Sequence, residues 1–83
     1  MLRIPVNNEE IIIRLKPNLS LYSFSKQQIL QVIEQEVVNL LSDREHSFAI
    51  FFKGHIIVGI IENHYIPTIT VTTIIPESNI HYL

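Results

Sequence analysis

The chain contains no cysteine, so it has neither disulfide bonds nor thiolate metal sites, and a reducing cytosol is permitted. Its longest strongly apolar run, residues 56–61, is far too short to cross a bilayer, which takes about 20 residues. The first ten residues also lack the apolar core of a signal peptide. We therefore expect a soluble, cytoplasmic protein that does not contact a membrane.

Positive charge is sparse and scattered. Six Lys and Arg residues stand against eight Asp and Glu residues, for a net charge of −2, and the cations form no run. Binding along a nucleic-acid backbone needs clustered cations that displace counterions from phosphates. The composition therefore argues against a DNA-binding module and against non-specific RNA binding. It is compatible with a small enzyme that touches one or two phosphates.

The length of 83 residues indicates one domain, spanning 1–83, with one modest core. The 47% of hydrophobic residues is enough for folding, and no repeat, low-complexity tract or linker interrupts the chain. A domain this small often gains stability from association. We expect a homo-oligomer or a complex with another protein.

A run of three strands dominates the second half of the chain. The apolar pattern predicts that Ile69, Val71 and Ile75 face the core and that Phe51 lies on the opposite face. Lys53-Gly54 is typical of a tight hairpin turn. The middle strand is apolar on both faces, which favours a central position in the sheet. The strands are expected at 47–52, 55–62 and 68–75.

One amphipathic helix is expected over 26–41, because apolar residues recur there at three- and four-residue steps. Ser25 and Gln28 fit a capping box, and Phe24 before the cap can pack on Ile29. The apolar stripe consists of Ile29, Val32, Ile33, Val37, Leu40 and Leu41.

The N-terminal segment completes the predicted order β-α-β-β-β. Residues 9–16 favour a strand, with a short helical turn as the alternative, whereas Pro5 and Asn7-Asn8 favour irregular structure over 1–8. The predicted fold is α+β, with one amphipathic helix packed on a three- to four-stranded antiparallel sheet. One helix covers one face, so we expect the other face to need the N-terminal segment, the tail or another molecule.

Four histidines, at positions 46, 55, 64 and 81, are candidate proton carriers, because His exchanges a proton near neutral pH. Their spacing is not that of metal ligands, so no metal site is predicted. The alternative is that they are solvated turn residues. Thr73 interrupts the expected core-facing row, either as a buried hydroxyl bonded to backbone or as a hydroxyl beside a cleft.

His81-Tyr82 pairs a possible general acid or base with a phenol near the C-terminus. Such a pair can promote attack of an RNA 2′-hydroxyl on its own phosphate, by proton transfer and by protonation of the leaving group. The alternative is a frayed tail, because terminal residues are commonly unordered.

Three stretches, FSKQQILQVIEQEVV, FFKGHIIVGII and VTTIIP, together resemble the small RelE-like domains of the barnase–EndoU–colicin–RelE superfamily. The resemblance implies a toxin-type ribonuclease that cleaves mRNA without a metal or cofactor and that binds an antitoxin. It implies His81 and Tyr82 as the catalytic pair and Thr73 as a residue lining the cleft. In this hypothesis His55 assists catalysis, and Lys53 and Arg44 are the candidate substrate-binding cations.

The chain departs from that family in its charge. RelE-like toxins are usually basic, and Ile and Val fill the strand positions at which such enzymes hold phosphate with Arg or Lys. An alternative hypothesis therefore stands beside the first one. In it the chain is a non-catalytic interaction domain, which binds a second copy or a partner protein through its exposed sheet face.

Overall fold

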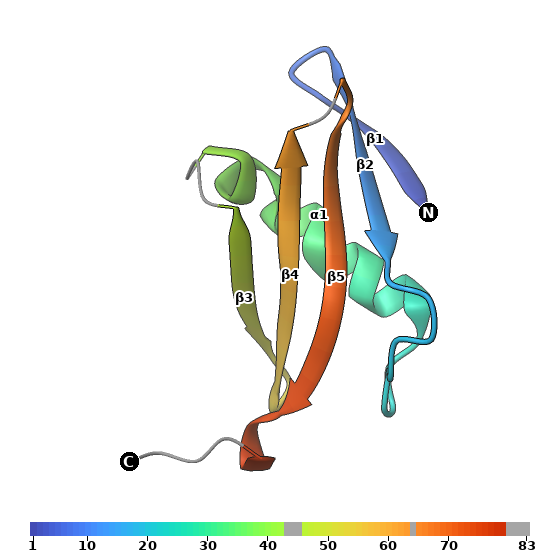
Figure 1. Ribbon diagram of the computed structural model, residues 1–83, viewed down its shortest axis with the longest axis vertical. Helices are drawn as coiled ribbons and strands as arrows, with labels where there is room; N and C mark the ends of the chain where they lie inside the picture. Colours follow the sequence, from blue (N-terminus) through green and yellow to red (C-terminus); the bar gives the residue numbers. More distant parts are fainter. Residues whose placement is uncertain (43–45, 64, 80–83) are drawn as a thin grey trace.

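One helix lies across one face of a five-stranded mixed sheet in the computed structural model, which describes residues 1–42, 46–63 and 65–79 (Figure 1). The sheet order is β1-β2-β5-β4-β3, in which β2 and β5 are parallel and all other neighbours are antiparallel. The elements are β1 (Leu2–Val6), β2 (Glu9–Leu15), α1 (Lys26–Ser42), β3 (Ser47–Phe52), β4 (His55–Asn63), β5 (Pro67–Pro76) and a 3-10 turn, η1 (Glu77–Asn79).

The α+β class and the single helix are confirmed, but the predicted number of strands, three to four, is wrong, since the sheet has five, and so are the predicted element order and strand directions. The order is β-β-α-β-β-β, and the sheet is mixed rather than antiparallel. β2 adds to the free edge of β5 and runs parallel to it, because the chain crosses the sheet through α1 before it returns. The middle strand is consequently β5 and not β4.

The N-terminal residues form a hairpin rather than irregular structure. Asn7 and Asn8 both have positive φ, of 52° and 68°, as a two-residue turn between twisted strands requires. Pro5 is tolerated because β1 is an edge strand, where a missing backbone N–H leaves no ladder bond unmade. An Asn-Asn pair between alternating apolar residues was the signal for this hairpin, and the proline obscured it.

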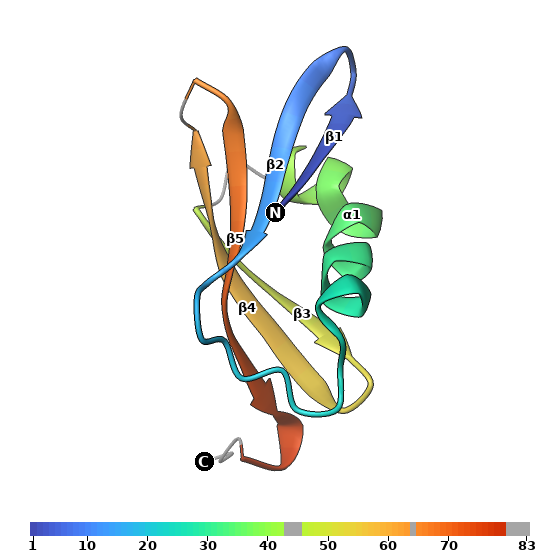
Figure 2. The same cartoon turned by 90° about the vertical axis from the view of Figure 1, so that its right-hand side faces the viewer.

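The start of α1 follows the predicted capping box. The backbone N–H of Gln28 donates to Ser25 Oγ at 3.1 Å, and the N–H of Ser25 donates to Gln28 Oε1 at 2.8 Å. The helix begins at Lys26 as predicted and ends one residue later than predicted, at Ser42. The helix lies against one face of the sheet in Figure 2, and the buried members of its apolar stripe are Ile29, Val32, Ile33 and Val37.

The pairing register defines two faces of the sheet. The helix-covered face carries Ile13, Ile69 and Ile57 in three successive strands, all fully buried. The opposite face, which we call the open face, carries the residues between them, and no helix of the described residues covers it (Figure 2). On this face Phe51 is 69% exposed and Ile60 is 39% exposed, as the sequence predicted for Phe51.

A β-bulge in β5 reverses the predicted direction of Thr73. Val58 pairs with Thr73 but Gly59 pairs with Val71, so Thr72 is an extra residue in β5. Ile69 and Val71 face the core as predicted, whereas beyond the bulge the core-facing residue is Ile74 and not the predicted Ile75. The prediction that Thr73 faces the core is wrong, because one inserted residue shifts the two-residue alternation.

Among the described residues, no helix has the length and apolar character needed to cross a membrane.

Candidate functional site

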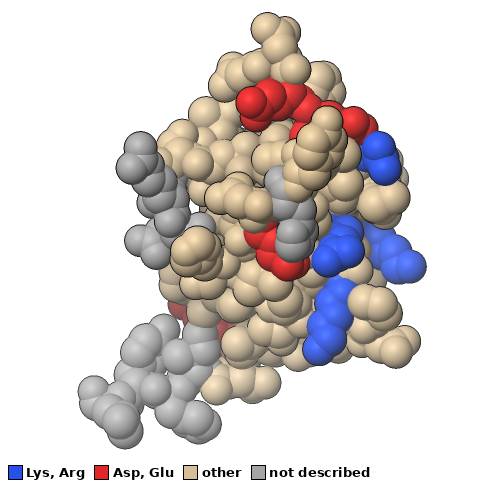
Figure 3. Space-filling view, turned by 45° about the horizontal axis from the view of Figure 1, so that its top comes forward, with Lys and Arg blue, Asp and Glu red and all other residues tan. Residues whose placement is uncertain are grey.

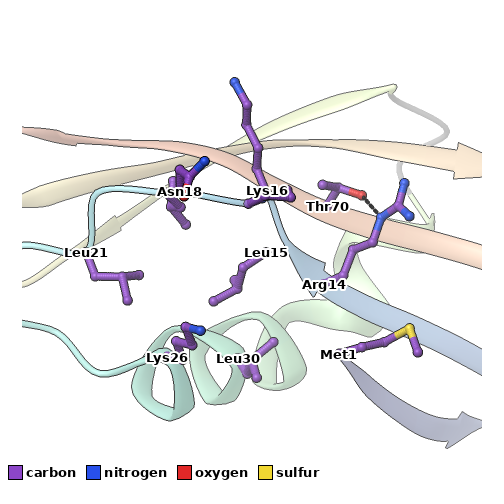
Figure 4. Close-up of a pocket in the computed structure, with 11 residues that line it drawn as sticks. Met1, Arg14, Leu15, Lys16, Asn18, Leu21, Lys26, Leu30 and Thr70 are labelled. Carbon is purple, nitrogen blue, oxygen red and sulfur yellow. Dashed lines mark hydrogen bonds between the residues drawn. The ribbon is translucent and has the colours of Figure 1, made fainter.

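A cavity of about 750 Å³ lies between the end of β2, the loop that follows it and the first turns of α1 (Figure 4). Its walls are apolar, because leucines from these three segments converge on it. All four of these leucines are only half-buried, so part of each side chain remains available to a ligand. They are Leu15, Leu19, Leu21 and Leu30.

The cavity exists because β1 is shorter than β2 on this side. β1 begins with Leu2, which lies opposite Ile13, so within the described residues Leu15 has no neighbouring strand on its outer side. Beyond it, the N–H of Lys16 donates to the Val71 carbonyl at 2.9 Å, which keeps the end of β2 against β5. The loop then turns away at Asn18, where φ is 64°. The space between this loop and α1 is left unfilled.

Positive charge surrounds the cavity. Arg14, Lys16 and Lys26 line it, which is half of the six cations in the chain. Among the described residues that line it, none is acidic. Blue side chains gather on one side of the molecule in Figure 3, whereas much of the red lies above them. The chain as a whole carries a net charge of −2, so this clustering runs against its overall balance.

Arg14 is the most constrained of the three cations. Its Nε donates to Thr70 Oγ1 at 2.9 Å, and its Nη2 lies 3.6 Å from Glu62 Oε1 (Figure 4). The first contact gives the buried hydroxyl of Thr70 a partner. Glu62 offsets part of the charge of Arg14, whose guanidinium is thereby held at one end of the cavity.

Lys16 and Lys26 are exposed, and within the described part of the chain neither forms an ion pair. Lys16 extends away from the helix in Figure 4, whereas Lys26 is the first residue of α1. A helix N-terminus carries partial positive charge, which adds to that of Lys26. The site therefore combines an apolar interior with a cationic rim, an arrangement that suits a ligand with an apolar body and an anionic head.

The ribonuclease residues predicted from the sequence are only partly in view. His81, Tyr82 and Arg44 lie outside the described residues. Lys53 and His55 lie together at the β3–β4 turn, where His55 Nδ1 is 3.0 Å from the Lys53 carbonyl oxygen. Both residues of this turn have positive φ, 46° at Lys53 and 74° at Gly54, as the predicted hairpin requires.

Two aromatic rings lie beside the ring of His55. Its ring centroid lies 5.2 Å from that of Tyr22 and 4.8 Å from that of Phe24, the second pair in an edge-on arrangement. Thr73 belongs to the open face, whereas His55 packs against these residues from the loop before α1. The structure therefore does not bring Thr73 and His55 together.

The sequence did not reveal the cationic cavity, because its three cations lie apart along the chain. Arg14 belongs to β2, Lys16 follows the end of β2 and Lys26 is the first residue of α1. One signal was present. Lys16 and Lys26 flank a short loop that contains two leucines, Leu19 and Leu21. These leucines belong to neither a helical nor a strand pattern of apolar residues, so they were candidates for lining a cavity.

Comparison of the chain with family models, with curated proteins and with solved structures gives no match. The RelE-like family therefore stays a prediction from the sequence, and the α+β fold with one helix on a five-stranded mixed sheet is what is established.

Proposed function

We propose that this chain is a binding domain whose cavity takes an amphipathic anion, with an aliphatic body and a carboxylate or phosphate head. One observation carries the proposal. Three cations, of which Arg14 is paired with Glu62, line an interior of four half-buried leucines in a chain that is acidic overall, and none of the described lining residues is acidic. A neutral ligand would not need the cations, and a purely ionic ligand would not need the leucines.

The size of the cavity supports a small ligand. Its volume of about 750 Å³ falls within the range of roughly 300–1,000 Å³ that ligand pockets occupy. Burying the aliphatic part of the ligand supplies affinity at roughly 25 cal/mol per Å² of apolar area. Exposed charge pairs add only about 0–1 kcal/mol each, so the rim chiefly decides which sign of charge is accepted.

Four probes with closely similar aliphatic bodies, a heptyl chain in the first and an octyl chain in the others, test the proposal: octanoate, octyl phosphate, octanol and octyltrimethylammonium. We expect both anions to shift the amide NMR signals of Leu15, Leu21 and Leu30 in a saturable manner, and the cation to bind most weakly. The two anions also distinguish a carboxylate site from a phosphate site. Equal binding of octanol and octanoate would show that the cavity does not select anions.

Charge reversal at the rim gives the matching protein variant. Lys16→Glu with Lys26→Glu is expected to weaken octanoate binding by about tenfold, because two rim pairs worth about 0.7 kcal/mol each are lost. Lys53→Glu is the control, since this exposed lysine lies at the β3–β4 turn and does not line the cavity. Unchanged affinity in the double variant, measured by titration calorimetry, would contradict the proposal.

A second proposal, RNA cleavage of the RelE type, is supported by the group at the β3–β4 turn. Tyr22 offers a ring for base stacking, and Lys53 and His55 offer a cation and a proton carrier beside it. η1 reaches the same turn, because the N–H of Glu77 donates to the Gly54 carbonyl at 2.9 Å. His81 and Tyr82 follow η1 in the sequence, outside the described residues.

Induced expression in a bacterial host tests this second proposal. We expect the wild type to arrest growth and the double variant His81→Ala with Tyr82→Phe to relieve the arrest at matched soluble levels. Thr73→Val is the control, because this exposed side chain on the open face is not beside His55. Normal growth with a well-folded wild type would exclude toxin-type ribonuclease activity in that host.

A further inference from the structure

The outer edge of β3 is open along its whole length in the described structure. Within the part of the chain that the structure describes, β3 is the last strand of the sheet and only β4 pairs with it. The N–H of Ile61 donates to the His46 carbonyl at 2.9 Å, so His46 and Ile61 are a hydrogen-bonded pair. Hydrogen-bonded pairs recur at every second residue of an antiparallel strand. Phe48, Ile50 and Phe52 consequently bond to β4. The backbone N–H and C=O groups of Ser47, Ala49 and Phe51 point outward.

The two edges of this sheet are protected differently. β1, at one edge, contains Pro5 and also Arg3, which pairs with Glu10 at 3.1 Å. Proline and charge are the usual means by which an edge strand is kept from pairing with another chain. β3, with the sequence SFAIFF, has no charge, no proline, no glycine and no bulge. It is a strand suited to pairing and exposed at an edge.

We propose that two copies of this chain pair β3 with β3 in antiparallel fashion, forming a homodimer with a continuous ten-stranded sheet. Placing the two-fold axis at Ala49 gives the one register in which all three outward-facing residues pair with one another. Ala49 then lies opposite the second copy's Ala49, and Ser47 lies opposite the second copy's Phe51. The contact is isologous, so it closes at two copies.

The side chains of the open face fit this register. Phe51 and Ile60 are the large exposed apolar residues near this edge, at 69% and 39% exposure. Ser47 pairs with Ile60 across β3 and β4. Phe51 placed opposite the second copy's Ser47 meets only a small side chain there, so its ring extends over that serine towards the second copy's Ile60. Each copy thus covers the exposed apolar residues of the other.

Small side chains permit the approach at the axis. The residue on the axis is an alanine, and the flanking pair joins a serine to a phenylalanine, so no two large side chains collide on the open face. A second copy is also favoured over an unrelated strand, because the same segment supplies both the large side chain and the small one that accommodates it.

Sedimentation velocity at increasing concentration, up to hundreds of micromolar, tests the dimer. We expect wild type to become dimeric and Ala49→Lys to raise the dissociation constant about tenfold or more, because two like charges then face each other at the axis. Thr73→Lys is the control, an exposed position on the open face away from this edge. A wild type that stays monomeric throughout would overturn the proposal, and so would a dimer that Ala49→Lys leaves unchanged while the fold is intact.

Cysteine cross-linking reports the register even if the lysine variant folds poorly. The natural chain has no cysteine, so a single introduced cysteine can form a disulfide only with the same cysteine of a second copy. Ala49→Cys should oxidise to a covalent dimer, since directly opposite residues have Cα atoms about 5.5 Å apart. Ser47→Cys should not, because four residues separate the two thiols along the strands, about 13 Å. Cross-linking at position 47 but not at 49 would overturn the register.

Discussion

Gly59→Ala is expected to lower the free energy of unfolding by about 3 kcal/mol, because an added methyl group has no space in the middle of the sheet. A Cβ at this position would collide with the Thr70 carbonyl oxygen and with the ring of Phe48, whose Cε1 would be 2.6 Å away. The phenylalanine ring can shift, but the carbonyl belongs to the backbone of β5, the central strand. A domain of this length has a total stability of only about 4–12 kcal/mol, so the variant should be largely destabilised.

Urea unfolding followed by circular dichroism measures this effect. Gly54→Ala is the comparison, because a Cβ there meets nothing within 4 Å, although φ is +74°. Its cost should come only from the strained backbone, at about 1 kcal/mol. A Gly59→Ala protein as stable as Gly54→Ala would show that the sheet can relax around the methyl group, and that the close packing of Phe48 on Gly59 matters little.

Ile33→Ala is expected to cost about 3 kcal/mol, within the usual range for truncating a fully buried isoleucine. Ile33 lies in the middle of α1, is 0% exposed and belongs to the apolar cluster between helix and sheet. Its removal leaves a cavity in the layer that attaches the single helix to the sheet. Because no second helix covers this face in the described structure, little else can compensate for the loss.

Val38→Ala is the matched control for Ile33→Ala, since it lies on the same helix but is 56% exposed. Val38→Ala should change the free energy of unfolding by no more than about 0.5 kcal/mol, which thermal unfolding followed by circular dichroism can measure. Equal losses in the two variants would mean that the burial of Ile33 between helix and sheet contributes little to stability, since alanine has the higher helix propensity at both positions.

The two proposed surfaces lie at different edges of the sheet. The cavity is lined by residues of β2, α1, the loop between them and Thr70, and no residue of β3 contributes to it. Pairing of two copies through β3 would therefore leave both cavities open. Binding of an anion and dimerisation are expected to be independent, so the variants of one surface serve as further controls for the other.

Sequence alone determined the elements whose signals are local. The capping box at Ser25, the apolar stripe of α1 and the Lys53-Gly54 turn each depend on residues within a few positions of one another. Secondary structure of this kind is encoded in short windows, and the predicted bounds of α1, β2 and β3 agree with the structure to within a residue.

Tertiary structure alone decided the strand order, the direction of Thr73 and the location of the cationic cavity. The parallel pairing of β2 with β5 joins segments more than fifty positions apart, which no short window contains. The bulge at Thr72 is set by how β5 pairs with β4, and one extra residue exchanges the faces of all that follow. Arg14, Lys16 and Lys26 line one cavity only because α1 packs beside the end of β2.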